Sequence, residues 1–210
     1  MQPDYTSSDK AMIRFFNCDN REFMKDIPDK LYDLAIIDPE YGIGASEMTM
    51  GSGKHKFKKG KKWDKKPPEK SYFDELFRIS KNQIIWGGNY FNLPLSPNWV
   101  IWDKLNPNLS FSEAELAWIR LGKLIRIFKY YSVNEDKIHP TQKPIKLYRW
   151  LLQNYAKPGQ KIFDSHRGSM SHAIACDMEG FDLDICELDK EYFDQALNRF
   201  KIYKSQGKLF

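Results

Sequence analysis

The segment DPEYGIG, residues 38–44, carries residue types that could receive a heteroaromatic substrate. Asp38 supplies a carboxylate, Tyr41 supplies an aromatic face, and Pro39 between them stiffens the backbone. A carboxylate acceptor, a backbone carbonyl in a fixed position and a ring together fit a flat heterocycle that bears an exocyclic amine. The same segment also fits a simple turn, and its shape alone favours the turn.

A second segment, FDSHRGSMS at residues 163–171, has the composition of a loop that binds a ligand. An acid is followed by small residues that lead into an expected helix, whose first backbone N–H groups can hold a polar or anionic group. Glu187 follows Gly168 by nineteen residues, at the end of the next expected strand, where a carboxylate can accept hydrogen bonds from ribose hydroxyls. The pattern GxGxxG is absent, so the loop alone also fits an ordinary strand–loop–helix connection. The loop and Glu187 together favour nucleoside binding.

The third segment, KIHPTQKP at residues 137–144, has no mechanism that its spacing reveals. His139 lacks a second ligand at metal spacing, so we expect no metal site. The three cysteines are odd in number and show no CxxC spacing, which argues against a disulfide framework and a structural zinc site. Cysteine usage therefore favours a reducing compartment, and we expect the protein to be cytoplasmic.

The elements that must position these segments alternate between strands and helices. We expect strands at residues 13–17, 32–38, 83–86, 99–102, 116–119, 124–130, 161–164 and 183–187, and helices at residues 20–27, 72–79, 144–155, 171–179 and 190–203. We expect the strands at 116–119 and 124–130 to form a pair that turns at Gly122. This alternation predicts an α/β fold with a mainly parallel sheet. In such sheets ligands bind beyond the carboxyl ends of the strands, which is where DPEYGIG, the loop after residue 164 and Glu187 fall.

Size and composition limit the class of protein. A chain of 210 residues and 24.8 kDa has the length of one domain, and we expect a single domain over residues 1–210. With 41% hydrophobic and 29% charged residues, the composition is that of a globular rather than a disordered protein. No apolar run approaches the ~18 residues of a transmembrane helix, and the polar N-terminus lacks a secretory signal, so we expect no association with a membrane.

The positive charge is concentrated in one segment. The net charge is +5, yet residues 54–70 hold nine lysines against two acids and so account for all of the excess. We interpret residues 45–70 as a basic loop insertion and a candidate phosphate-binding element. A merely solvated loop is the alternative. The candidate binding residues are Lys54, Lys56, Lys58, Lys59, Lys61, Lys62, Lys65 and Lys66.

Taken together and in this order, the motifs resemble those of a known family. DPEY, then HPTQKP before a helix, then FDSHRGSMS, then ICELDKEYF at residues 185–193 are similar to the motifs of β-ordered DNA amino-methyltransferases, and of small prophage-type adenine-N6 methyltransferases among them. The resemblance extends from about residue 18 to residue 203. It implies a Rossmann-like fold that depends on S-adenosylmethionine, with a permuted motif order in which the catalytic motif precedes the cofactor motif.

The resemblance also implies an activity and partners. The protein would transfer a methyl group from S-adenosylmethionine to adenine N6 in double-stranded DNA, as the methyltransferases of restriction–modification systems do. The chain leaves little room for a separate target-recognition domain, so specificity would come from the loops at residues 45–70 and 103–115, and a second subunit in a homodimer could contribute. The lysines of the basic insertion would then be DNA-binding residues, with aromatic residues able to stack or wedge.

Residue roles follow from the resemblance in the same way. Asp38 and the Pro39 carbonyl would accept hydrogen bonds from the amine of the target base, and Tyr41 would stack on that base. The resemblance also implies a set of cofactor-binding residues. Asp164 and the loop with His166, Gly168 and Ser169 would hold the methionine part, Glu187 the ribose hydroxyls, Asp19 the adenine amine, and Thr141, Gln142 and Lys143 the carboxylate side.

The chain departs from the family pattern at several positions. Glu40 stands where the family has proline, the family's GSG is GSM at residues 168–170, and the bulky Arg167 precedes it. A catalytically degenerate, DNA-binding protein is therefore one alternative to the adenine methyltransferase. A cytosine-N4 or RNA methyltransferase is another, although Asp38 favours adenine because cytosine-N4 members more often carry serine there.

Overall fold

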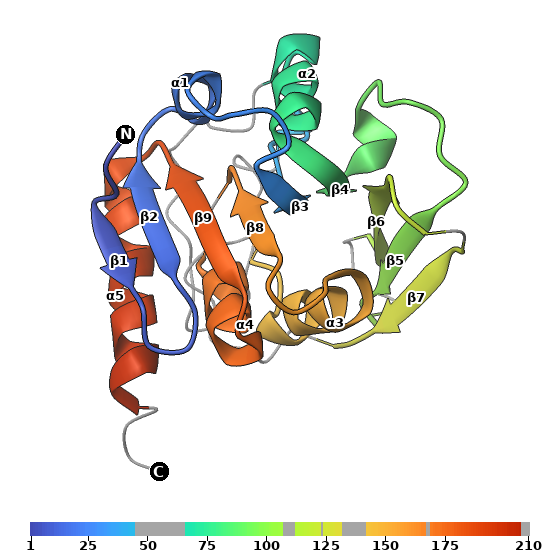
Figure 1. Ribbon diagram of the computed structural model, residues 1–210. Coiled ribbons are helices and arrows are strands. Elements are labelled where there is room, and N and C mark those ends of the chain that lie inside the picture. The colour runs from blue at the N-terminus through green and yellow to red at the C-terminus, as the bar shows by residue number, and fades with distance from the viewer. Residues whose placement is uncertain (45–65, 107–111, 123, 132–141, 167–168, 207–210) are drawn as a thin grey trace.

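The computed structural model describes residues 1–44, 66–106, 112–122, 124–131, 142–166 and 169–206 (Figure 1). Strands and helices alternate along much of the chain. The strands are β1 (Tyr5–Ser7), β2 (Ile13–Asn17), β3 (Tyr32–Ile37), β4 (Ser80–Trp86), β5 (Trp99–Asp103), β6 (Ala114–Ile119), β7 (Arg126–Lys129), β8 (Lys161–Asp164) and β9 (Asp182–Glu187). The helices are α1 (Asn20–Lys25), α2 (Lys70–Ile79), α3 (Ile145–Tyr155), α4 (Ser171–Glu179) and α5 (Lys190–Gln206), with a short 3-10 helix, η2 (Gly88–Tyr90).

The strands form one nine-stranded sheet in the order β1-β2-β9-β8-β3-β4-β6-β5-β7. The pairs β2–β9, β9–β8, β8–β3, β3–β4 and β5–β7 are parallel, whereas β1 and β6 run antiparallel to their neighbours. The expected α/β fold with a mainly parallel sheet is confirmed. From β8 the chain continues through α4 to β9, which is next to β8 in the sheet. From β3 it continues through α2 to β4, which lies in the opposite direction along the strand order. The carboxyl ends of β8 and β3 therefore border a topological switch point.

Helices cover both faces of the sheet. Successive strand residues point to opposite faces, so Ile36 packs with the cluster that includes residues of α3, α4 and α5, and Ile37 packs with the cluster from α1 and α2. The same alternation separates Ile162 from Phe163. The central strands are buried on both faces, which explains why their sequences are apolar runs without a polar side.

One predicted pairing is wrong. The strands at 116–119 and 124–130 do not pair with each other, because β5 lies between them and pairs antiparallel with β6 and parallel with β7. Val100 and Trp102 of β5 are buried, so this strand belongs inside the sheet and offers its backbone to neighbours on both sides. The connection through Gly122 is short, but a short connection does not decide which strands pair.

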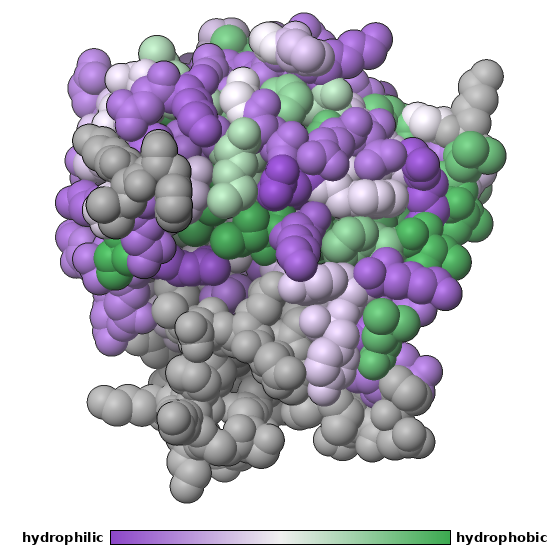
Figure 2. All heavy atoms as spheres, turned by 90° about the horizontal axis from the view of Figure 1, so that it is seen from below, coloured by the Kyte–Doolittle hydropathy of each residue, from purple (hydrophilic) through white to green (hydrophobic). Residues whose placement is uncertain are grey.

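The opposite end of the molecule from the switch point has a mixed surface. Figure 2 views the protein from below, away from the carboxyl ends of β2, β8 and β9, and shows polar residues interspersed with smaller apolar areas. None of the helices in the described ranges has the length and apolar character needed to cross a membrane.

Candidate active site

The DPEYGIG segment, the loop after β8 and Glu187 meet at the carboxyl edge of the sheet. Asp38 follows β3, Asp164 ends β8 and Glu187 ends β9 (Figure 1). The parallel register of β3 with β8 and of β8 with β9 brings these ends side by side. The sequence-based expectation that they lie along one edge is therefore met.

The carboxylate of the DPEY motif lies in a network of alternating charges. Lys143 has a side chain only 2% exposed, and its Nζ lies 2.6 Å from Asp38 Oδ1 and 2.9 Å from Glu115 Oε2. Lys104 Nζ lies 2.7 Å from the other Glu115 oxygen. The Tyr41 hydroxyl donates a hydrogen bond to Asp38 Oδ1 at 2.7 Å. We call Asp38, Lys143, Glu115 and Lys104 the acid–lysine cluster.

The electrostatics of this cluster fix which groups carry charge. Burial opposes ionisation of Glu115, but Lys143 and Lys104 outweigh it and lower the pKa of Glu115 to about 2. Burial likewise opposes the Lys143 ammonium, but Asp38 and Glu115 together raise its pKa above the ordinary value. The pKa of Asp38 is raised, because burial and the nearby Glu115 carboxylate outweigh the effect of Lys143. Asp38 is thus an oriented acceptor with more proton affinity than an exposed aspartate.

Aromatic residues surround the Tyr41 ring. Tyr90 stacks on it with ring centroids 5.1 Å apart and planes 16° apart, and Phe91 approaches it edge-on at 6.1 Å. Gly87 has a φ of +69°, and a Cβ at this position would lie 2.2 Å from the ring. Glycine there permits both the left-handed backbone and the close approach of Tyr41. Tyr90 is 44% exposed, so this aromatic pair reaches the surface.

Asp164 organises the loop after β8 from inside the protein. It is 1% exposed; one carboxylate oxygen accepts a hydrogen bond from the His166 backbone N–H at 3.0 Å, and the other lies 2.9 Å from His172 Nδ1. The His172 imidazole stacks on Tyr148 of α3 at 4.6 Å. The structure therefore uses both oxygens of Asp164 to hold the loop and the start of α4.

The start of α4 is held by the last helix. Arg199 of α5 donates hydrogen bonds to the Ser169 carbonyl and to Ser171 Oγ. Met170 has a φ of +65° and is fully buried in the core cluster that contains residues of α3 to α5. Its side chain fills the core. Arg167 and the predicted cofactor residue Gly168 lie outside the described residues.

The ribose and adenine residues expected from the resemblance lie next to each other. Glu187 is partly exposed, and its Oε1 accepts a hydrogen bond from the Asp189 N–H at 2.9 Å. The Cys18 N–H donates to the Glu187 carbonyl at 3.1 Å, which holds the start of α1 beside β9. Asp19 is the N-cap of α1 and pairs with Arg21, which lowers the pKa of this carboxyl. The structure thus places Asp19 near Glu187 with part of its acceptor capacity used by the helix cap.

The HPTQKP motif is described only from its fourth residue onward. Gln142 and Lys143 are buried, whereas His139 and the predicted cofactor residue Thr141 lie outside the described residues. Lys143, which the resemblance assigns to the cofactor, instead reaches Asp38 and Glu115. It therefore links this motif directly to DPEY.

Of the eight candidate DNA-binding lysines, the structure describes Lys66. It is exposed, and the adjoining Pro67 packs against Gly42, where an added Cβ would lie 2.5 Å from the proline ring. The carboxyl end of the basic segment therefore adjoins the catalytic loop. Lys54, Lys56, Lys58, Lys59, Lys61, Lys62 and Lys65 lie outside the described residues.

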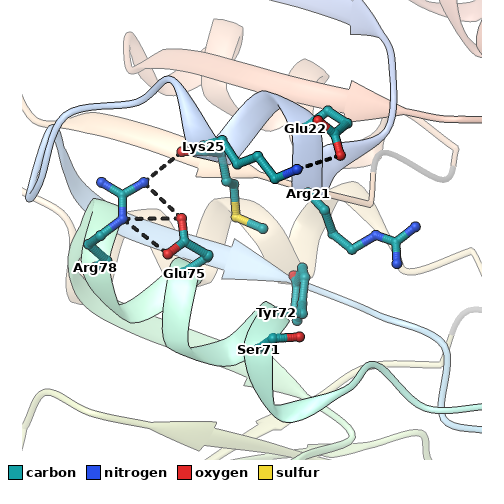
Figure 3. Close-up of a pocket in the computed structure, with 8 residues that line it drawn as sticks. Arg21, Glu22, Lys25, Ser71, Tyr72, Glu75 and Arg78 are labelled. Atoms are coloured by element: carbon teal, nitrogen blue, oxygen red, sulfur yellow. Dashed lines mark hydrogen bonds and ion pairs between the residues drawn. The ribbon is translucent and has the colours of Figure 1, made fainter.

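An open groove between α1 and α2 borders this region. In Figure 3 two pairs of its charged side chains meet: Arg78 pairs with Glu75 at 2.8 Å, and Lys25 pairs with Glu22 at 2.7 Å. Tyr72 lines the groove, and its hydroxyl lies 2.5 Å from Ser165 Oγ in the loop after β8. The remaining lining residues are Arg21, Met24 and Ser71. Asp38, Pro39, Asp164 and Glu187 do not line the groove.

Sequence reasoning missed several residues of the site. Glu115 and Lys104 complete the acid–lysine cluster, and Gly87 and Tyr90 support Tyr41. Only Glu115 gave a signal, since it is a carboxylate within the otherwise apolar strand AELAWI. The segment GGNYF was interpreted only as the end of a strand.

Comparison with solved structures identifies similar folds. A structure of the M1.HpyAVI–SAM complex matches with a TM-score of 0.63 and 20% identity, and covers 90% of this chain and 100% of that chain. TTHA0409 from Thermus thermophilus, a putative DNA modification methylase complexed with S-adenosyl-L-methionine, matches with a TM-score of 0.54 and 17% identity over 89% and 92% of the two chains. The cytosine-N4-specific PvuII DNA methyltransferase matches with a TM-score of 0.63 and 11% identity over 95% and 89%. The expected Rossmann-like methyltransferase fold is confirmed.

A family model described as DNA methylase, for N6 and N4 methyltransferases, matches residues 54–198. This match covers more than half of the chain and includes the HPTQKP motif, the loop after β8 and Glu187. The expected relationship to DNA amino-methyltransferases is therefore confirmed. The chain belongs to the DNA methylase family, whose members transfer methyl groups from S-adenosylmethionine to amino groups of DNA bases.

Proposed function

We propose that this protein methylates the N6 amine of adenine in double-stranded DNA. The observation that carries the proposal is the placement of Asp38 at the switch point, fixed by Lys143 and by the hydroxyl of Tyr41. An aspartate at this position favours adenine over cytosine, as the resemblance implies. The proposal includes a single domain over residues 1–210, with a basic insertion at about 45–70 that contacts DNA.

The residues around the switch point fit S-adenosylmethionine in chemical type. The Glu187 carboxylate uses one oxygen for the Asp189 N–H, and because a carboxylate has about four acceptor positions it can also accept from ribose hydroxyls. His172 Nε2 is buried and has no hydrogen-bond partner among the described residues, so the cluster around Asp164 can take a further polar group. When bound, the cofactor supplies an electrophilic methyl group on a sulfonium centre.

Asp38 and Pro39 would activate the amine of the base. The lone pair of an aromatic amine is delocalised into the ring, which makes the amine a poor nucleophile. Acceptors on its N–H groups draw the nitrogen toward tetrahedral geometry and localise that lone pair. Asp38, oriented by Lys143, and the Pro39 carbonyl would supply these acceptors in fixed positions, so positioning contributes much of the rate.

Asp38 would also take the proton that methylation releases. An amine that gains a methyl group carries an additional positive charge until it loses one N–H proton. Burial and the Glu115 carboxylate raise the pKa of Asp38, which increases its capacity to accept that proton. Lys143 and Lys104 keep Glu115 ionised, so the charge of Glu115 would stay the same while Asp38 changes protonation.

The target base must leave the duplex to reach Asp38. An aromatic surface offsets part of the cost of unstacking, and the ring of Tyr41, supported by Gly87 and adjoining the exposed Tyr90, offers such a surface. The basic segment, which meets the catalytic loop where Pro67 packs on Gly42, would bind the flanking phosphates. A homodimer would enlarge this DNA-binding surface.

Nucleoside analysis of DNA after reaction tests the proposal. Unmethylated double-stranded DNA is incubated with the purified protein and S-adenosylmethionine, then digested and analysed by mass spectrometry. We expect N6-methyladenine. N4-methylcytosine as the product would contradict the assignment to adenine, methylation of RNA alone would contradict the DNA substrate, and DNA binding without methylation would indicate a catalytically degenerate protein.

A further inference from the structure

A residue that departs from the family pattern meets a residue of the cofactor loop across the switch point. Glu40, which replaces a proline of the catalytic motif, has its Oε2 3.4 Å from Nε2 of His166 in the cofactor loop. The side chains are 34% and 15% exposed, so the pair is largely shielded from solvent. It joins the loop after β3 directly to the loop after β8.

The other nitrogen of His166 is also held. Its Nδ1 lies 2.8 Å from Ser165 Oγ and 3.5 Å from the hydroxyl of Tyr72 in α2. Asn20 of α1 donates a side-chain N–H to the Ser165 carbonyl at 3.1 Å, which holds the same loop beside the imidazole. Helix α2 thus contacts His166 through Tyr72, α1 contacts the loop through Ser165, and Nε2 of the imidazole faces Glu40.

Among the described residues, three carboxylates favour the positive form of His166. Burial opposes its positive form, but Glu40, Asp164 and Glu187 outweigh burial and raise the pKa of His166 above its ordinary value. The same pairing lowers the pKa of Glu40, against the effect of burial. Glu40 is therefore not an uncompensated charge beside the active site, because its counter-charge lies in the cofactor loop.

We propose that Glu40 and His166 are positioning residues whose ion pair fixes the catalytic loop to the cofactor loop. The ion pair fixes the position of Asp38 relative to the cofactor loop. It takes over the role of the proline that the family has at position 40, which would make the catalytic loop rigid. This inference rests on the proposed function, but the ion pair itself can be measured without DNA or turnover.

The pair has a defined pH range. Glu40 must be ionised and His166 protonated, so the pair exists above the lowered pKa of Glu40 and below the raised pKa of His166. As the pH rises through the pKa of His166, the imidazolium loses its proton and the link weakens. Methylation should then show an alkaline loss of rate. The Glu40→Gln variant should lack this loss, because it has no ion pair at any pH.

The first experiment measures the pKa of His166 by NMR titration of the full-length protein labelled at histidine, which is tractable because the chain has four histidines. Replacing the charge in Glu40→Gln should lower the pKa of His166 by about one unit, as loss of a close opposite charge does. The control Asp74→Asn removes a carboxylate from the exposed ion pair with Lys70 and should leave that pKa unchanged. An unchanged pKa in Glu40→Gln would overturn the ion pair.

The second experiment tests positioning through single-turnover methylation at saturating cofactor, with cofactor affinity measured by calorimetry. Glu40→Gln and His166→Gln should each slow the step by about tenfold, and the double variant should be no slower than either, because all three lack the same interaction. Independent effects that multiply in the double variant would overturn the proposal, as would a faster Glu40→Pro variant. If wild type transfers no methyl group, the proposed function fails while the NMR result still decides the ion pair.

Discussion

At the scale of single residues, the site depends on Lys143 more than the motifs suggest. The resemblance assigns this lysine to the cofactor, whereas the structure buries its ammonium between Asp38 and Glu115. A buried charge of this kind is stable only when its partners are in place. We therefore regard Lys143 as the group that orients Asp38, with Lys104 balancing the second carboxylate.

Lys143→Met should separate methyl transfer from cofactor binding. Without the ammonium, Asp38 and Glu115 lose their shared partner, so we expect kcat to fall by about 100-fold through misplacement of Asp38. Breaking this buried pair should also lower the free energy of unfolding by about 3 kcal/mol. S-adenosylmethionine affinity, measured by calorimetry on the folded variant, should be nearly unchanged. Lys146→Met, at an exposed position on the helix that follows the motif, is the matched control.

A loss of cofactor affinity that parallels the loss of kcat would contradict this assignment. It would return Lys143 to the role that the resemblance implies. Wild-type behaviour in both measurements would remove Lys143 from the site.

At the scale of elements, the sequence predicted most of the framework. The strand expected at residues 32–38 is β3, and the helix expected at residues 171–179 is α4, which ends at Gly180 with a φ of +78°. The pairing of the strands was harder to predict from the sequence. The pairing of β5 with both β6 and β7 depends on which edges are buried together, and no local pattern carries that information.

The candidate site was predictable in part for a similar reason. Asp38, Asp164 and Glu187 lie at strand ends, so the parallel sheet alone brings them to one edge. Glu115 lies in β6, which pairs antiparallel with β4, and Lys104 follows β5. Both are far from Asp38 in the sequence. Their contribution required the three-dimensional arrangement.

The start of α4 offers a prediction about stability. Met170 has a left-handed backbone, which costs an ordinary residue about 1–2 kcal/mol, yet its fully buried side chain fills the core. Loss of a buried methionine side chain costs about 2–5 kcal/mol, so packing outweighs strain. Met170→Gly should therefore lower the free energy of unfolding by about 1–3 kcal/mol in urea denaturation. A stabilised variant would mean that strain, rather than packing, dominates at this position.

At the scale of the whole molecule, the excess positive charge is concentrated in one segment of the sequence. Outside residues 54–70 the acids outnumber the lysines and arginines, so the basic segment alone makes the protein cationic. Its carboxyl end lies against the catalytic loop through Pro67 and Gly42. Phosphate binding by this segment would bring the duplex to the same edge of the sheet that holds Asp38.

Neutralising four lysines tests this distribution. The variant Lys58→Gln, Lys59→Gln, Lys61→Gln, Lys62→Gln should weaken DNA binding for all sequences alike and flatten its salt dependence. Each phosphate contact contributes about 0.9 to the slope of log K against log salt, so the slope should fall by at most about 3.6. Cofactor affinity should stay the same, because the cofactor motifs lie elsewhere. An identical slope for both proteins would leave the segment as solvated charge and move DNA binding to another surface.

The central claim is that Asp38 is the acceptor that activates the base amine. Its most direct test compares single-turnover methylation of unmethylated DNA by wild type and by Asp38→Ala, with S-adenosylmethionine binding and unfolding measured on both proteins. We predict that the variant stays folded and binds the cofactor as wild type does, while formation of N6-methyladenine falls by at least about 100-fold, the scale of losing one group that stabilises the transition state. Methylation by Asp38→Ala within about tenfold of wild type would contradict the account, because the amine would then be activated without this carboxylate.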